Sequence, residues 1–407
     1  MKKIEGGVTA AKGYQAAGVE AGVKKANRKD MALVYSEVPA KVAGTFTTNV
    51  VKAAPVKWDQ GIVKEEECAQ AIVLNSGIAN ACTGKVGEEM NFNMANLVAE
   101  SLNIPVKSVL TASTGVIGMQ LPLEAIKRGA LLLAPALNDS LEAGTMAATA
   151  IMTTDTTCKE CAVSFELDGK IITVGGMSKG SGMIHPNMAT MLGVVTTDIS
   201  ISKELLQQAL SNDVKDSFNM ISVDRDTSTN DSLLIFANGL ANNIEITEEN
   251  EAYDLFCEAL NIITTDLAKK MAGDGEGATK LFEVKVVNAR DKSQAVNLSK
   301  SIITSNLVKT AIYGSDANWG RILCAMGYAG EEFDPEIVDL SIESAYGNLC
   351  LVQNGMATDY SEDTATKILS EKSVTAIADM KLGEASATAW GCDLTYDYVK
   401  INGDYRS

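Results

Sequence analysis

A single threonine near the middle of the chain stands where its hydroxyl could act as a nucleophile. Residues 179–198 read KGSGMIHPNMATMLGVVTTD, and Thr190 lies between a glycine-containing loop with the only histidine, His185, and a short apolar run at 191–195. Such a run is typical of a buried strand. If the Ala189–Thr190 peptide bond were cut, Thr190 would carry both a hydroxyl nucleophile and a free α-amine base. Cleavage would then create the catalyst.

Two other interpretations of this segment stay open at the level of chemistry. The Ala-Thr pair occurs five more times in the chain, and Thr favours half-buried pleated surfaces, so Thr190 could be an ordinary strand residue. A serine hydrolase triad would depend on His185 alone and would lack the G-x-S-x-G elbow. We therefore expect His185 to support the loop rather than to act as the base.

Composition limits the classes of protein that fit. A chain of 407 residues exceeds the size at which one core stops growing, so two domains or lobes are expected. The net charge is −17 and no basic run with interleaved aromatics occurs, which argues against nucleic-acid binding. No apolar run approaches the length of a membrane span, and no signal peptide is recognisable. We expect a cytoplasmic protein without a membrane partner.

Metal and cofactor motifs are weak or incomplete. The eight cysteines suit reduced thiols, and Cys158-x-x-Cys161 is a lone pair without a second one. Residues 273–280, GDGEGATK, lack the ending of a phosphate-binding loop. Residues 224–231 begin like a calcium loop but lack its glycine and glutamate, so they form either a polar wall of a site or an Asx-rich turn. No metal and no cofactor is expected.

The elements alternate between strands and helices. Asp168-Gly169 between two alternating runs predicts a hairpin and hence antiparallel pairing. Mixed sheets layered with helices, an α/β (α+β) class, are expected. Predicted strands cover 31–35, 71–74, 109–112, 161–174, 233–236, 281–287, 337–342 and 349–352, and predicted helices cover 87–103, 122–136, 141–151, 203–220, 250–272 and 364–370.

Several segments together resemble one known family. They are NSGIANACTG at 75–84, STGVIG at 113–118, MTTDT at 152–156, KGSGMIHPNMATML at 179–192, GDGEGATK at 273–280, YGSDANWGR at 313–321 and NGDYRS at 402–407. In order and spacing they are similar to the glutamate N-acetyltransferase, or ornithine acetyltransferase, family of arginine biosynthesis. The likeness extends over nearly the whole chain.

The resemblance implies a fold and a maturation step. The implied fold is the four-layer arrangement of mixed sheets and helices of the ornithine acetyltransferase/aminopeptidase superfamily. Family members cut themselves before the threonine of the MATML segment, here between Ala189 and Thr190. An α chain, 1–189, and a β chain, 190–407, would result and would remain associated as an α2β2 heterotetramer.

The implied reaction moves an acetyl group from N2-acetyl-L-ornithine to L-glutamate through an acetyl-threonine intermediate. The sequence leaves open whether acetyl-CoA is a second donor. An aminopeptidase or amidase of the same superfamily, which would pass the acyl group to water, is the alternative enzyme. An uncleaved binding protein is the alternative outside catalysis.

The resemblance also implies roles for particular residues. Thr190 is the nucleophile, and the Thr114 hydroxyl and the Gly115 N–H form the oxyanion hole. From the charges alone, we expect Lys179 to meet the substrate α-carboxylate, and Glu276 and the terminal carboxylate of Ser407 to receive the ornithine ammonium. The implied substrate contacts are Thr153, Lys179, Thr190, Glu276, Asn402 and Ser407.

Overall fold

The computed structural model describes residues 1–24, 27–185 and 191–403, and it contains two compact units. The expectation of two lobes for a chain of this length is confirmed. Helix α6, Glu251–Gly273, belongs partly to each unit. Unit 1 comprises Met1–Gly180, Pro186–Asn219 and Thr227–Leu267, and unit 2 comprises Ser181–His185, Met220–Asp226 and Ala268–Ser407.

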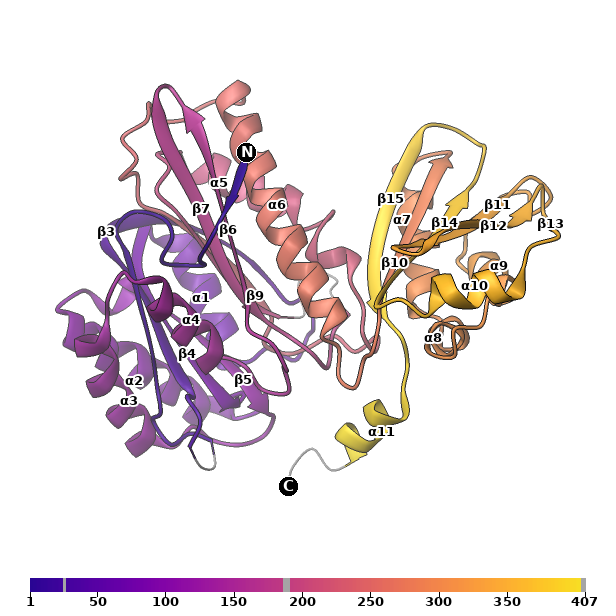
Figure 1. Cartoon of the computed structure of the whole chain (residues 1–407). Coiled ribbons are helices and arrows are strands. Elements are labelled where there is room, and N and C mark those ends of the chain that lie inside the picture. Colours follow the sequence, from indigo (N-terminus) through magenta and orange to yellow (C-terminus); the bar gives the residue numbers. More distant parts are fainter. Residues whose placement is uncertain (25–26, 186–190, 404–407) are drawn as a thin grey trace. The chain divides into compact units, whose positions relative to one another are not determined.

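Unit 1 is built on a nine-stranded mixed sheet (Figure 1). Its strand order is β1-β6-β7-β8-β9-β3-β4-β5, and β2 pairs with β3. The pairs β8–β9 and β4–β5 are parallel, and the other pairs are antiparallel. The strands are β1 Lys2–Ile4, β2 Tyr14–Val19, β3 Met31–Phe46, β4 Cys68–Ile78, β5 Val109–Val116, β6 Lys159–Leu167, β7 Lys170–Lys179, β8 Leu192–Thr197 and β9 Ser232–Ala237.

Both faces of the central strands of this sheet are covered. Side chains alternate along a strand, so Ala32 and Val34 enter one apolar cluster while Met31 and Leu33 enter another. Every residue of β8 is buried. Burial on both sides explains why these strands read as continuous apolar runs instead of alternating ones.

The helices of unit 1 pack on this sheet and on one another. Helix α4 packs on β2 and β3, α5 packs on β3 and β9, and α2 packs on α3 and β5. The helices are α1 Ala54–Glu65, α2 Gly84–Leu102, α3 Leu123–Ala136, α4 Leu141–Ala150 and α5 Lys203–Asp213, with short 3-10 turns at Val106–Ser108 and Phe218–Met220.

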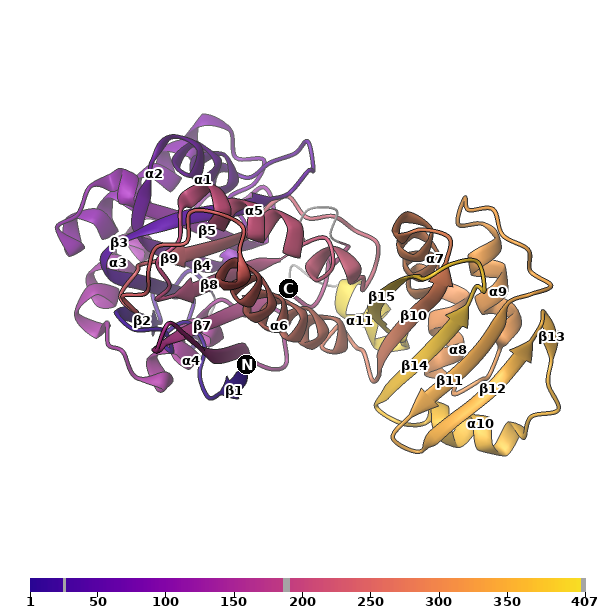
Figure 2. The same cartoon turned by 90° about the horizontal axis from the view of Figure 1, so that it is seen from above.

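Unit 2 contains a six-stranded sheet in the order β13-β12-β11-β14-β10-β15. Helix α7 packs on β10 and β15, and α10 packs on β11 and β12 (Figure 2). The elements are β10 Leu281–Ala289, α7 Lys292–Thr304, α8 Asn306–Tyr313, α9 Trp319–Gly327, β11 Asp339–Ser344, β12 Gly347–Gln353, β13 Met356–Ala357, α10 Glu362–Leu369, β14 Ser373–Asp379, β15 Ala385–Cys392 and α11 Tyr396–Gly403.

The predicted class of mixed sheets with helices is confirmed, and the predicted hairpin is present. Asp168 and Gly169 have φ values of 52° and 71° between the antiparallel strands β6 and β7, as a two-residue primed turn requires. The predicted helix over 203–220 was too long. Helix α5 ends at Asp213, where the Ser217 hydroxyl donates to the Asp213 carbonyl. The four-layer stacking of the sheets remains a prediction.

No helix within the described ranges combines the length and the apolar character that crossing a membrane would require.

Candidate active site

The predicted oxyanion residues lie at the end of β5, where it runs parallel to β4. Gly115 is paired with Gly77, and the two residues have φ values of +129° and +105°, which side chains rarely adopt. A Cβ atom on Gly115 would lie 2.2 Å from the carbonyl carbon of Gly77. Glycine is therefore required at position 115 both for its backbone conformation and for the close approach of the two strands.

Lys179 is the last residue of β7, and the structure brings it to Thr114. Its Nζ donates a hydrogen bond of 3.2 Å to the Thr114 Oγ1 atom, and the lysine is only 8% exposed. In this contact the hydroxyl is the acceptor, so its own proton is available for another acceptor. An ammonium donor also polarises the hydroxyl and strengthens its donation. Two of the predicted site groups thus form one hydrogen-bonded pair.

Asp155 fixes two predicted substrate contacts at once, and sequence reasoning missed it. Its carboxylate accepts from the N–H of Thr153 at 3.0 Å, from the N–H of Gly180 at 2.8 Å and from Lys159 Nζ at 2.7 Å. Burial alone would raise the pKa of Asp155, but Lys179 and Lys159 outweigh burial and lower it to about 2. The ionised carboxylate therefore ties Thr153 to the residue that follows Lys179.

A second buried carboxyl, Asp231, interacts with the backbone of Met191, the residue after Thr190 in the sequence. Met191 is held on both sides: its N–H interacts with the Asp231 side chain, and its carbonyl accepts from Ser232 N–H at 2.9 Å. Burial raises the pKa of Asp231 well above its usual range, although Ser228 and Lys179 favour its charged form. Its Oδ2 atom has no hydrogen-bond partner among the described residues. Asp231 thus contacts the residue before β8 and interacts electrostatically with Lys179.

Three predicted residues fall outside the described ranges. Ala189 and Thr190 belong to 186–190, and Ser407 belongs to 404–407. Their predicted roles as cleavage site, nucleophile and substrate contact remain predictions.

The predicted substrate contacts of unit 2 form a separate pair. Asn402 on α11 donates through Nδ2 to the Glu276 Oε2 atom at 2.6 Å. Glu276 is 6% exposed, and its N–H donates to the Ser181 carbonyl at 3.0 Å. A Cβ atom on Gly182 would lie 2.3 Å from the carboxyl carbon of Glu276, so the absence of a side chain there makes room for the carboxylate. Glu276 is therefore a buried acceptor held in place by Asn402.

His185 is joined to Ser222 within unit 2 but is poorly suited to catalysis. Its Nδ1 lies 3.0 Å from the Ser222 Oγ atom. Burial, followed by the charges of Lys300 and Arg225, lowers the pKa of His185 to about 4. A triad needs a carboxylate that stabilises the imidazolium, whereas these two neighbours are cations. The pair is consistent with the expected supporting role.

The sequence left two interpretations of the segment 224–231, an Asx-rich turn and a polar wall of a site, and each fits one end of the segment. Asp224 accepts from the N–H groups of Met183 at 2.6 Å, Ile184 at 2.9 Å and Asp226 at 3.1 Å, the last as an Asx turn. At the other end of the segment, Asp231 lies beside the Lys179 group. One end is therefore a turn that holds the 183–184 loop, and the other end borders the candidate site.

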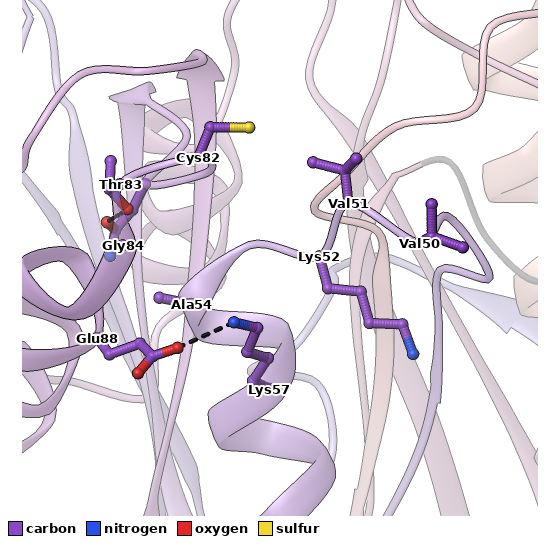
Figure 3. A pocket seen from close by; sticks show the side chains of 10 residues that line it. Val50, Val51, Lys52, Ala54, Lys57, Cys82, Thr83, Gly84 and Glu88 are labelled. Atoms are coloured by element: carbon purple, nitrogen blue, oxygen red, sulfur yellow. Dashed lines mark hydrogen bonds and ion pairs between the residues drawn. The ribbon is translucent and has the colours of Figure 1, made fainter.

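Unit 1 also has a hollow of about 180 Å³ that contains none of the predicted site residues (Figure 3). Val51 faces Cys82 across it, and Lys57 and Glu88 form an ion pair of 2.9 Å at one side. The hollow is lined by Val50, Val51, Lys52, Ala54, Lys57, Asn80, Cys82, Thr83, Gly84 and Glu88.

Comparison with known proteins identifies the family. A family model described as the ArgJ family matches residues 15–407. The arginine biosynthesis bifunctional protein ArgJ of Thermotoga neapolitana is 52% identical over 397 residues, covering 97% of this chain and 99% of the relative. The protein of the same name from Caldanaerobacter subterraneus subsp. tengcongensis is 52% identical over 407 residues and 100% of both chains.

A crystal structure of the arginine biosynthesis bifunctional protein argJ from Bacillus halodurans is 46% identical, with a TM-score of 0.49; it covers 52% of this chain and 97% of its own. The family model and the two relatives show that the chain belongs to the ArgJ family. The resemblance seen in its motifs is thereby confirmed.

Proposed function

We propose that the chain is an acetyltransferase of arginine biosynthesis that moves the acetyl group of N2-acetyl-L-ornithine to L-glutamate. Membership of the ArgJ family supports the enzyme class, and the relatives at 52% identity carry names that place them in arginine biosynthesis. In this proposal Thr190 is the nucleophile. The reaction exchanges one amide for another, so it needs no energy source and is divided into two acyl transfers.

One observation carries the proposal: polar groups suited to acyl transfer gather where β8 begins. Strand pairing sets Lys179 opposite Leu192, and Met191, which immediately follows Thr190 in sequence, is bonded to Ser232. Lys179 in turn donates to Thr114, next to Gly115. An ammonium and a hydroxyl, with the Gly115 backbone next to them in sequence, thus lie at the ends of β7 and β5, and Lys179 is paired with Leu192, two residues after Thr190 in the sequence.

In the first transfer, Thr190 Oγ attacks the acetyl carbonyl while its α-amine accepts the hydroxyl proton. An α-amino group titrates near ~7.7–8.0, so a useful fraction is a free base at neutral pH. The oxyanion that forms receives hydrogen bonds from the Thr114 hydroxyl and the Gly115 N–H. The carbon–nitrogen bond then breaks, and the leaving amine of ornithine takes the proton from the Thr190 amine.

In the second transfer, the amine of glutamate attacks the acetyl-Thr190 ester. The Thr190 amine receives the proton of the attacking nitrogen and returns one to Thr190 Oγ as the ester bond breaks. Lys179 binds the α-carboxylate that both substrates share, with Thr153 beside it. Glu276, held by Asn402 at 2.6 Å, binds the side-chain ammonium of ornithine together with the terminal carboxylate of Ser407.

Cleavage between Ala189 and Thr190 is part of the proposal because only a free Thr190 amine can act as the base. The two chains would remain joined through the ladder between β7 and β8, which has six residue pairs, and would assemble as α2β2. The word bifunctional in the names of the relatives favours acetyl-CoA as a second acetyl donor.

Product analysis tests the reaction directly. Incubation of the purified protein with acetylornithine and glutamate should yield ornithine and acetylglutamate in equal amounts. Release of acetate with no acetylglutamate would identify an amidase instead. Replacing acetylornithine by acetyl-CoA tests the second donor, and acetylglutamate with free CoA is the expected outcome.

A further inference from the structure

A second lysine, Lys24, lies at the candidate site of unit 1, where its side chain contacts Met152. It lies between β2 and β3, where the buried carboxylate of Asp30 fixes the backbone. Asp30 accepts from the N–H groups of Ala21 at 2.6 Å, Val23 at 2.6 Å and Lys24 at 2.9 Å. Three backbone donors on one buried carboxylate position the backbone from Ala21 to Lys24, and with it the start of the Lys24 side chain.

The stem of Lys24 crosses the backbone of the oxyanion strands. A Cβ atom on Gly77 would lie 2.8 Å from the Lys24 Cγ atom, so Gly77 leaves room for the stem. Gly77 is in turn the partner of Gly115 in the β4–β5 ladder. Lys24 therefore packs directly on the strand that forms the back of the predicted oxyanion hole.

The ammonium of Lys24 reaches the predicted substrate contacts from this side. Its Nζ donates to the carbonyl of Met152, the residue before Thr153, at 2.5 Å. The charges of Asp30 and Asp155 attract it, and those of Arg28 and Lys179 repel it. Lys24, Thr153 and Lys179 thus belong to one electrostatic neighbourhood.

This neighbourhood has more positive than negative charge. Lys24, Arg28, Lys159 and Lys179 outnumber Asp30 and Asp155, and burial disfavours ionisation of Asp231. Burial also lowers the pKa of Lys24 to about 8 because the ammonium is poorly solvated. A bound carboxylate would replace the missing solvation and restore the charge balance.

The two substrates of the proposed reaction differ in the charge of their side chains. Acetylornithine carries a side-chain ammonium, whereas glutamate carries a second carboxylate. We infer that Lys24 binds the side-chain carboxylate of the glutamate acceptor, while Lys179 binds its α-carboxylate. This inference rests on the proposed function and deepens it, because it makes Lys24 the residue that selects a dicarboxylate acceptor.

Acceptor kinetics of Lys24→Met test the inference. Glutamate is compared with glutamine, whose side-chain amide has the same shape without the charge. The variant should raise the KM for glutamate at least 10-fold and lower kcat/KM for glutamine by a clearly smaller factor, so that the preference for glutamate over glutamine falls. The burst of ornithine released from acetylornithine without acceptor measures any damage to the oxyanion strands separately, because that half-reaction does not involve glutamate. Lys24→Arg should recover part of the preference for glutamate.

Lys29→Met is the matched control. Lys29 belongs to the same turn, but its Nζ donates to the Gly18 carbonyl at 2.9 Å. The control should keep the glutamate KM of the wild type. If Lys24→Met does not fold, Lys24→Gln serves in the same comparison.

Equal losses for glutamate and glutamine would overturn the inference, since they would show that Lys24 only supports the oxyanion strands. An unchanged glutamate KM would overturn it as well. Wild-type protein that makes no acetylglutamate would overturn the proposed function itself, and this outcome is seen without any variant.

Discussion

Two buried carboxyls illustrate how neighbouring charges decide ionisation at the level of single residues. Asp155 and Asp231 are both buried and both lie near Lys179. Asp155 also has the fully buried Lys159 ammonium at 2.7 Å and stays ionised, whereas burial dominates at Asp231 and raises its pKa. Desolvation penalises a carboxylate, and at Asp155 two cations together with hydrogen-bond donors outweigh that penalty.

The Asp155–Lys159 pair makes the free energy of unfolding depend on pH. The pKa of Asp155 in the folded protein is about 2, below its ordinary value near ~3.9, so the ionised carboxylate stabilises the fold above that value. This contribution should fade as the pH falls from about 4 to about 2. Asp155→Asn should lower the free energy of unfolding at pH 7 by about 3–5 kcal/mol, because Lys159 would lose its counter-charge. Urea titrations at several pH values measure both effects.

The double variant Asp155→Asn/Lys159→Met provides the control, because it removes both charges and should recover part of the loss. An Asp155→Asn protein with the stability and acid profile of wild type would contradict the assignment.

Removing the Thr114 hydroxyl should reduce turnover more than binding. An oxyanion donor acts mainly in the transition state, so Thr114→Val should lower kcat by about 10²–10³ and change the KM for acetylornithine little. Thr149→Val is a suitable control because that exposed hydroxyl donates to Thr145 within its own helix. Steady-state kinetics decide the matter, and an unchanged kcat would remove Thr114 from the oxyanion role.

The sequence predicted most strands of unit 1 but few of the short helices of unit 2. Continuous apolar runs such as 233–236 mark strands that are covered on both faces. Helix α1 escaped prediction because its apolar residues are few, although the proline in its first turn is a common helix start. Strand β2 escaped because small residues dominate Tyr14–Val19. The secondary structure of such segments is decided by packing against larger neighbours. A local sequence pattern carries no information about that packing.

The contact between β4 and β5 gives a prediction at the scale of elements. Gly115→Ala should lower the melting temperature and abolish most activity, since its Cβ would meet the Gly77 backbone at 2.2 Å and its φ is +129°. Gly118→Ala is the matched control: its φ is also positive, at +82°, but nothing lies within 4 Å of the added Cβ. Only the backbone cost of about 1–2 kcal/mol should remain there. Thermal melts of the two variants separate the clash from the backbone strain, and equal melting temperatures would refute the clash.

At the scale of the whole molecule, the candidate residues come from segments far apart in sequence. Thr114, Thr153 and Lys179 belong to unit 1, whereas Glu276 and Asn402 belong to unit 2. These residues could be predicted from the sequence only because the motifs that contain them resemble those of the family. Asp155 and Lys24 went unnoticed, and Asp231 was considered only as part of the segment 224–231, because the importance of these residues depends on burial and on contacts between distant segments. Charged residues of these types are mostly surface residues when judged from sequence alone.

Cleavage is a property of the whole chain, and Thr190→Ala tests it. This variant should remain one polypeptide without activity, because both the attacking hydroxyl and the new amine depend on Thr190. Wild-type protein should give two bands on a denaturing gel and a single peak when native. Ala148→Gly, at another Ala-Thr pair, should be processed normally. Two fragments from Thr190→Ala would contradict self-cleavage by this residue.

Strand β8 has a further consequence for the proposed β chain. It lies between β7 and β9 in the interior of a sheet, and all of its residues are buried. Most polypeptide ends fray and are trimmed by exopeptidases. A newly made end that leads at once into a fully paired interior strand would resist such digestion from Leu192 onward. Any trimming would therefore stop before β8, and the strand that joins the two proposed chains would stay whole.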